Sequence, residues 1–232
     1  AAMSDTLKSI TDPARRAALE PYLAWTSLAD MAFDRMAHYG AKPFLWGKRD
    51  GTYVSQSFNA VAGAVADCAH GLAGLGLKPG ERVALVAENR PEWLIADLGI
   101  ISAGGVTVPA YTTNTVDDHI HILKDSGSRF VIVSTPELLE RVLPAAAEVD
   151  TVERVILIDS AAPTSPAKPV DTWSDLLSSG HSARGEAAPA PLHEAKREDL
   201  ACLIYTSGTG GAPKGGMLSH GAILCNSMGA CD

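Results

Sequence analysis

The first third of the chain alternates apolar and polar positions in a way that predicts a helix, a hairpin and a second helix. Apolar residues recur at helical spacing between Thr26 and Tyr39, and Gly40 follows as a stop signal. Two short β-prone runs flank Arg49-Asp50-Gly51, and an Asp-Gly pair between such runs is typical of a β-hairpin. An alanine-rich amphipathic pattern then predicts a helix from Phe58 to Leu75.

From about residue 80 onward, short apolar runs alternate with amphipathic stretches. The predicted strands are 83–87, 106–108, 130–133, 155–158 and 200–205. The predicted helices between them begin at Pro91, Thr115 and Pro136, and Gly104 and Gly127 end the first two. Strands that are apolar on both faces and alternate with helices indicate a parallel sheet covered on both sides. We therefore expect the α/β class: a largely parallel, doubly wound sheet with helices on both faces, plus an N-terminal helix and β-hairpin.

Composition divides the chain into three parts. Residues 1–25 are polar and are expected to form an N-terminal arm, and residues 26–198 are expected to form a first α/β subdomain. Residues 199–232 would supply a strand, a phosphate-binding loop and the start of the next subdomain. Within the first subdomain, 161–191 is rich in Pro, Ser and Ala, so we interpret it as a loose surface excursion. A short capped helix is expected inside it at 172–177.

The overall balance of residues excludes several classes of protein. With 46% hydrophobic and 20% charged residues among 232, the chain is neither disordered nor fibrous. It carries 19 Lys and Arg against 27 Asp and Glu, a net charge of −8 that argues against a nucleic-acid partner and a polybasic membrane anchor. The longest apolar stretch, Trp93–Tyr111, is interrupted by Asp97 and two glycines, so no integral membrane segment is expected. Peripheral membrane association stays open.

The cysteines and the first residues bear on the compartment. The four cysteines are Cys68, Cys202, Cys225 and Cys231, and none forms a C-x-x-C pair. This spacing disfavours zinc and thioredoxin-type chemistry and fits free thiols in a reducing compartment. The N-terminal residues have neither the basic nor the apolar region of a signal peptide. We therefore expect a cytoplasmic protein.

A loop rich in glycine and hydroxyl groups follows the last predicted strand. It reads Tyr205-Thr206-Ser207-Gly208-Thr209-Gly210-Gly211-Ala212-Pro213-Lys214-Gly215-Gly216. Glycines remove the Cβ atoms that keep a backbone from wrapping an anion, and they allow successive N–H groups to point inward. Three hydroxyls add donors, and Lys214 adds a positive charge. Open α/β sheets bind ligands at the carboxyl ends of their strands, so this loop is predicted to bind the phosphates of a nucleotide.

The loop does not fit the P-loop of kinases and ATPases. That pattern requires glycine before the lysine, where Pro213 stands, and Ser or Thr after it, where Gly215 stands. The next helix is expected to begin only after Ser219, a natural N-cap. Acyl-independent ATP hydrolysis is therefore disfavoured.

The same run resembles the phosphate-binding signature Y-T-S-G-T-T-G-x-P-K-G-V of the adenylate-forming ligases, which include acyl-CoA synthetases, luciferases and adenylation domains. It departs from that form at Gly210, where threonine is usual, and at Gly216, where valine is usual. Residues 80–85, 89–93 and 103–109 resemble earlier blocks of the family, so the likeness runs from about residue 26 to the end. The segment 109–113 and the Thr-Gly-Gly variant of the loop are most similar to long-chain fatty acyl-CoA synthetases.

The resemblance implies a two-step reaction. Such enzymes join a fatty acid to ATP, forming an acyl-adenylate and pyrophosphate, and then transfer the acyl group to coenzyme A. It also implies that the β- and γ-phosphates, bridged by Mg²⁺, are bound by Thr206, Ser207, Gly208, Thr209, Gly210, Gly211 and Lys214, with Lys214 as the catalytic residue.

The resemblance further implies that this chain is an N-terminal fragment, truncated before the rest of the large N-terminal domain and inactive alone. Two alternatives stay open. One is a different adenylate-forming ligase, such as an aryl or medium-chain acyl-CoA synthetase or an adenylation domain. The other is a non-catalytic nucleotide-binding α/β module. Acyl-chain length and oligomeric state are not predicted.

Three histidines are candidates for binding a metal ion or a phosphate group. His119 and His121 are two residues apart and would point to different sides of a helix, so we expect a solvent-facing pair rather than a metal site. His220 directly follows the loop region and is expected to serve the start of a helix rather than to bind phosphate.

Overall fold

The computed structural model describes residues 11–159, 166–206 and 212–229. The N-terminal elements are α2 (Pro13–Leu19), α3 (Pro21–Ala24), α4 (Leu28–Tyr39), β1 (Pro43–Arg49), β2 (Thr52–Ser57) and α5 (Phe58–Gly74). The following elements are β3 (Arg82–Val86), α6 (Pro91–Ser102), β4 (Val106–Pro109), α7 (Val116–Ser126), β5 (Phe130–Val133), α8 (Pro136–Ala147) and β6 (Arg154–Leu157). The last are β7 (Val170–Thr172), α9 (Trp173–Arg184), β8 (Leu200–Thr206), β9 (Lys214–Ser219) and α10 (His220–Gly229).

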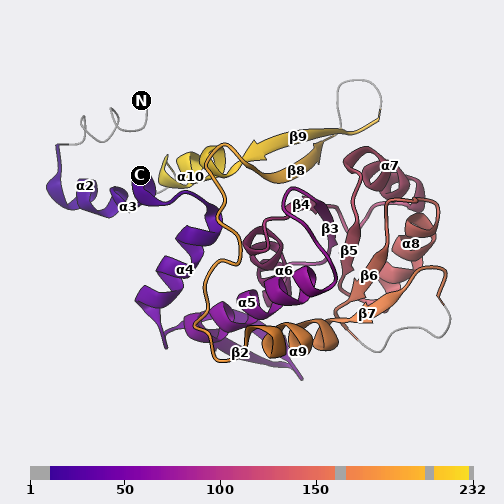
Figure 1. Ribbon diagram of the computed structural model, residues 1–232, viewed down its shortest axis with the longest axis horizontal. Coiled ribbons are helices and arrows are strands. Elements are labelled where there is room, and N and C mark those ends of the chain that lie inside the picture. The colour runs from indigo at the N-terminus through magenta and orange to yellow at the C-terminus, as the bar shows by residue number, and fades with distance from the viewer. Residues whose placement is uncertain (1–10, 160–165, 207–211, 230–232) are drawn as a thin grey trace.

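The described residues form two sheets. Strands β1 and β2 make the antiparallel hairpin predicted around Asp50, where φ is +49° and the next residue, Gly51, has φ +81°. The main sheet has seven strands in the order β7-β6-β5-β3-β4-β8-β9 (Figure 1). All its neighbouring strands are parallel except the edge pair β8 and β9. The largely parallel α/β fold is therefore confirmed.

Both faces of the main sheet are covered because its strands are apolar on both sides. Val83 and Leu85 of β3 pack with the cluster that contains residues of α5, α6 and α9. Ala84 and Val86 of the same strand pack with the cluster formed by α7 and α8. The chain leaves β4, crosses to the other side of β3 to form β5, and so places a topological switch point between β3 and β5.

Helix ends follow the local signals in the sequence. Thr115 and Asp118 form a complete capping box at the start of α7, and Gly127 ends that helix with φ +60°. Ser27 caps α4 by accepting a hydrogen bond from the Asp30 N–H. Ser219 accepts one from the Ala222 N–H at 3.2 Å, so α10 begins where it was predicted.

The described part of the segment 161–191, residues 166–191, contains more regular structure than its composition predicts, so the interpretation of that part as a loose excursion is corrected. It contributes β7, an edge strand parallel to β6, and the twelve-residue helix α9, twice the length of the predicted short helix. Helix α9 packs closely on α5: a Cβ at Gly180 would lie 1.7 Å from the carbonyl oxygen of Asp67. Small residues permit this approach, and the same small residues made the segment look like a loop.

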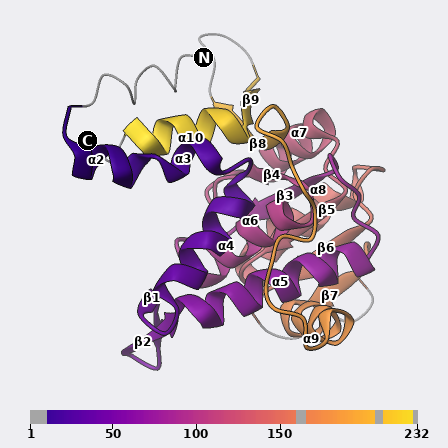
Figure 2. The same cartoon turned by 60° about the vertical axis from the view of Figure 1, so that its left-hand side comes forward.

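The N-terminal arm packs against the C-terminal helix of the described chain. Leu19 of α2 contacts Met228, and Trp25 and Leu28 share a buried cluster with Leu224 of α10. In Figure 2, α2 and α3 lie alongside α10. The two ends of the described chain are thus joined in one layer beside the sheet.

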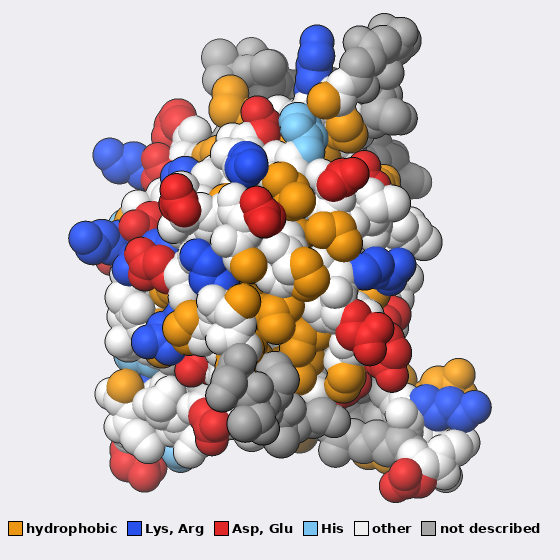
Figure 3. Space-filling view, turned by 90° about the vertical axis from the view of Figure 1, so that its right-hand side faces the viewer, with side chains coloured by type: hydrophobic (Ala, Val, Ile, Leu, Met, Phe, Trp, Pro, Cys, Tyr) orange, Lys and Arg blue, Asp and Glu red, His pale blue; other side chains and the backbone are white. Residues whose placement is uncertain are grey.

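The surface on the side of α7 and α8 mixes charges of both signs around a strip of apolar side chains (Figure 3). Within the described ranges, none of the helices combines the length and the apolar composition required to cross a bilayer.

Candidate functional site

The predicted phosphate loop connects two neighbouring strands of the main sheet. Thr206 is the last residue of β8 and Lys214 is the first residue of β9, and the two are paired across the antiparallel ladder. Both side chains are exposed, at the carboxyl end of β8. The ends of the loop are therefore held next to each other, with the Lys214 ammonium group free to face a ligand. Five other predicted residues lie outside the described residues, namely Ser207, Gly208, Thr209, Gly210 and Gly211.

Helix α7 contacts the chain just before and just after these loop residues. The Tyr205 hydroxyl donates a hydrogen bond to an Asp125 carboxylate oxygen at 2.7 Å. The His121 Nε2 lies 2.7 Å from the carbonyl oxygen of Pro213. A carbonyl oxygen only accepts, so Nε2 carries the hydrogen. Burial and the neighbouring Asp125 carboxylate raise the pKa of Tyr205, which keeps its hydroxyl protonated as a donor.

The packing of Tyr205 leaves little room for a side chain at position 215. A Cβ there would lie 3.0 Å from the Tyr205 ring. At Gly216, by contrast, a Cβ would meet only the Ile204 carbonyl oxygen at 3.5 Å, an ordinary contact. The Cβ of the usual valine of the family signature would therefore be accommodated at 216.

A cavity of about 340 Å³ lies beside the loop ends. Tyr205, Thr206 and Pro213 contribute to its lining from the loop ends. The rest of the lining comes from the end of β4 and the segment after it, and from α7: Pro109, Ala110, Tyr111, Asn114, Asp118 and Ile122. Two segments that are almost a hundred residues apart in sequence, both singled out by resemblance, therefore share one cavity.

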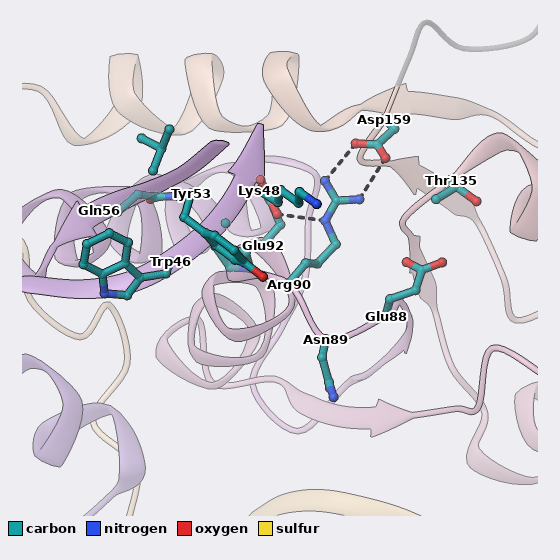
Figure 4. A pocket seen from close by; sticks show the side chains of 13 residues that line it. Trp46, Lys48, Tyr53, Gln56, Glu88, Asn89, Arg90, Glu92, Thr135 and Asp159 are labelled. Atoms are coloured by element: carbon teal, nitrogen blue, oxygen red, sulfur yellow. Dashed lines mark hydrogen bonds and ion pairs between the residues drawn. The ribbon is translucent and has the colours of Figure 1, made fainter. Parts of the chain in front are cut away.

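A larger cavity of about 630 Å³ was not predicted (Figure 4). It opens where β3, β5 and β6 end, near the switch point, and the β1–β2 hairpin faces it with Trp46 and Tyr53. Arg90 is held there by two 2.8 Å hydrogen bonds to the Asp159 carboxylate and a third to Glu92. Two sequence signals pointed to this region: the polar run that directly follows the buried strand β3, and the resemblance of residues 89–93 to a block of the family.

The three histidines have different environments. His119 is buried, with 2% exposed, so the prediction that it faces solvent was wrong. Burial and the nearby Arg141 guanidinium lower its pKa, which keeps it neutral. His121, two positions on, points instead to the loop. His220 is also buried, and its Nδ1 accepts a hydrogen bond from the Leu28 N–H at 3.3 Å, so it joins α10 to α4 at the start of the helix.

The chemistry around the loop suits an anion. At the described ends of the loop, the Thr206 hydroxyl and the Lys214 ammonium group donate to or attract negative charge, and the carboxylates of Asp118 and Asp125 lie nearby on α7. Within the described ranges, no three His, Cys, Asp or Glu side chains converge as a metal site would require.

Sequence comparison identifies the class of protein. The chain matches the family described as AMP-binding enzyme over residues 32–232, and it belongs to that family. Among curated relatives, it is 30% identical over 185 residues to the long-chain-fatty-acid–CoA ligase ACSBG1 of Bos taurus, covering 80% of this chain and 25% of that protein. It is 30% identical over 181 residues to the long-chain-fatty-acid–CoA ligase FadD15 of Mycobacterium tuberculosis, covering 78% of this chain and 29% of that protein.

A third relative transfers fatty acids to a different acceptor. It is the chloroplastic long-chain-fatty-acid–[acyl-carrier-protein] ligase AEE15 of Arabidopsis thaliana, 26% identical over 228 residues, with 88% of this chain and 31% of that protein covered. The chain thus spans between a quarter and a third of the length of these relatives.

Solved structures confirm the fold. A long-chain-fatty-acid-CoA ligase from Archaeoglobus fulgidus matches with a TM-score of 0.75 at 23% identity, over 89% of this chain and 39% of that one. The adenylation domain of a carboxylate reductase from Mycobacterium chelonae matches with a TM-score of 0.74 at 20% identity, over 95% of this chain and 39% of that one. At these identities the likeness concerns the α/β architecture alone.

Proposed function

We propose that this chain is the N-terminal, phosphate-binding part of an ATP-dependent long-chain fatty acid–CoA ligase. The complete enzyme would join a fatty acid to ATP, releasing pyrophosphate, and then pass the acyl group from the adenylate to the thiol of coenzyme A. The observation that carries the proposal is the pairing of Thr206 with Lys214, which closes the glycine-rich loop at the carboxyl end of β8. Family membership and the names of the relatives support it.

The loop has a specific electrostatic task in this reaction. A carboxylate attacks the α-phosphorus while the leaving pyrophosphate gains negative charge. Amide dipoles and an ammonium group already in place stabilise that charge without reorganising. We assign the β- and γ-phosphates to Thr206, Ser207, Gly208, Thr209, Gly210, Gly211 and Lys214. The Lys214 ammonium is the catalytic charge, and Mg²⁺ enters as part of the Mg·ATP substrate.

The described residues supply only part of such a site. The chain corresponds to less than a third of each curated relative, so we propose that the acyl, adenine and coenzyme A sites depend on further polypeptide. The isolated 232-residue chain is then expected to show no fatty acid-dependent ATP–pyrophosphate exchange. We also propose that residues 1–25 form an arm, that residues 26–198 form a first subdomain, and that residues 199–232 form the loop segment.

The names of other matches define the alternatives. One relative is named for an acyl-carrier-protein acceptor, and one structural neighbour is an anthranilate CoA ligase with 23% identity. A ligase for another acid or another thiol acceptor is therefore the second candidate. Assays with long-chain, medium-chain and aryl acids, each with coenzyme A and with acyl carrier protein, separate these functions.

The decisive experiment is Lys214→Ala in the complete ligase, assayed by fatty acid-dependent ATP–pyrophosphate exchange. Removing a charge that stabilises the transition state is expected to lower the rate by about 10²–10³-fold. Lys124→Ala is the matched control, because Lys124 is an exposed lysine on α7. An unchanged exchange rate in Lys214→Ala would remove the loop from the mechanism, and equal losses in both variants would show a general effect of charge.

A cytoplasmic location is proposed on the basis of thiol chemistry. Cys68, Cys202 and Cys225 are free thiols, as in a reducing compartment. Two relatives are named as chloroplastic and peroxisomal, so fractionation of the source cells is the required test.

A further inference from the structure

Helix α7 contacts the polypeptide at both ends of the phosphate loop. Tyr205, which precedes Thr206, bonds to Asp125, and Pro213, which precedes Lys214, bonds to His121. Both bonds are 2.7 Å long, and they join residues 80 and 92 positions apart in sequence. We propose that His121 is a positioning residue for Lys214: its Nε2–H holds the Pro213 carbonyl and so orients the peptide that leads into the lysine. The inference rests on the proposed function of the loop and adds a residue to it.

Helix α7, which carries His121, is held firmly in the fold. α7 is fixed by a capping box at its start and a left-handed glycine at its end, and Ile122 and Leu123 are buried in the core shared with α8. His121 lies on the same helix, half-buried. A contact from such an element restrains its partner more strongly than a contact from another loop would.

Proline makes the contact effective. The ring of Pro213 restricts φ to about −65°, so the main remaining freedom of this residue is ψ, the rotation that moves its carbonyl. The carbonyl is hydrogen-bonded to His121, so that rotation is restrained as well. The next peptide nitrogen belongs to Lys214, the first residue of β9. The direction in which the lysine side chain leaves the backbone is therefore set by His121 on one side and by the ladder with β8 on the other.

The aromatic ring of Tyr205 connects the two contacts. It meets the His121 ring edge-on, with centroids 6.2 Å apart and an interplanar angle of 87°. The same ring occupies the space that a side chain at Gly215 would need. His121, Tyr205, Pro213 and Gly215 thus form one packed group directly behind Lys214. Moving any one of them moves the lysine.

Two substitutions separate the hydrogen bond from the packing. His121→Phe keeps an aromatic ring against Tyr205 but removes the donor. His121→Gln replaces the ring but places an amide N–H at similar reach. In the complete ligase we expect His121→Phe to lower kcat for fatty acid-dependent ATP–pyrophosphate exchange by about ten- to a hundredfold, the scale of a misplaced catalytic group. The KM for the fatty acid is expected to stay unchanged, and His121→Gln is expected to recover most of kcat.

A second measurement uses the 232-residue chain itself. Amide hydrogen exchange at residues 214–216 is expected to be faster in His121→Phe than in the wild type, and close to wild-type in His121→Gln. Thermal unfolding of all variants confirms that they fold, and Lys124→Ala controls for a change on the exposed face of α7.

The outcomes distinguish this inference from the proposed function. If Lys214→Ala abolishes exchange activity while His121→Phe behaves as the wild type, the positioning role is wrong and the proposed function stands. Equal impairment of the Phe and Gln variants would show a merely structural role and overturn the inference. If Lys214→Ala has no effect, the proposed function fails. The restraint of the Pro213 carbonyl by His121 is tested separately: unchanged amide exchange at residues 214–216 in His121→Phe would reject it.

Discussion

Replacing His220 is expected to weaken the attachment of α4 to the helix that follows the loop. The backbone N–H of Leu28 donates to His220 Nδ1 at 3.3 Å, and the histidine is only 2% exposed. His220→Ala leaves that buried N–H without an acceptor, which costs about 1–3 kcal/mol, and it also removes the packing of the ring. Together with the cavity, the loss in the free energy of unfolding is expected to be about 2–5 kcal/mol.

Because His220 is buried, the free energy of unfolding is also expected to depend on pH. Burial lowers the pKa of His220 below its ordinary 6.5. As the pH falls below about 6.5, the unfolded chain therefore binds the proton first, and the free energy of unfolding decreases by up to about 1.4 kcal/mol per pH unit. The stabilisation is complete above about pH 6.5. His119 acts in the same direction, whereas the Asp97 carboxyl, whose pKa burial raises to about 6, acts in the opposite direction.

His220→Asn isolates the contribution of His220 from these other groups. The Asn Oδ1 can take the place of Nδ1 as acceptor, and it does not titrate. Urea unfolding followed by tryptophan fluorescence, at about pH 7.5 and about pH 5.5, would give the difference between wild type and His220→Asn at each pH. We expect that difference to shrink at the lower pH. A difference independent of pH would refute the reasoning, as would Ala and Asn variants of equal stability.

Two further predictions concern packing and thiol reactivity. Gly180→Ala places a methyl group 1.7 Å from the Asp67 carbonyl oxygen, so we expect it to lower the free energy of unfolding by about 3 kcal/mol or more. Gly63 has open space around it, so we expect Gly63→Ala to stabilise α5 by about 0.5–1 kcal/mol. Thermal unfolding compares them, and equal midpoints would contradict the packing of α9 on α5. Iodoacetamide should label exposed Cys225 well before Cys68, because burial raises the pKa of the Cys68 thiol and denies access. Peptide mass spectrometry measures the order, and early labelling of Cys68 would show that the core opens.

Much of the fold could be predicted because its strands are buried on both faces. The predicted strand 130–133 and the predicted helix beginning at Pro136 coincide with β5 and the start of α8. A continuous apolar run marks the strand, and the Thr135 cap followed by proline marks the start of the helix. These signals lie within a few neighbouring residues, so they predict the two elements without any knowledge of tertiary contacts.

The rest depends on contacts between distant segments, which periodicity does not reveal. Gly180 of α9 is explained by the close approach of this helix to α5. The sequence placed Lys214 in a loop, but it gave no indication that α7 supports the loop through His121 and Asp125. The sequence predicted that His119 faces solvent. His119 and His121 are two positions apart, so they point in different directions from a helix, and no sequence pattern showed which of the two faces the core.

The contact between Leu28 and His220 has a consequence for synthesis. The two residues are 192 positions apart, so a ribosome adding roughly 5–20 residues per second needs about 10–40 seconds between them. During that interval Trp25 and Leu28 have been made, but Leu224, which they contact in the finished fold, has not. An apolar patch without its partner invites association with other nascent chains or with chaperones. The arm therefore completes its docking only after α10 has been made.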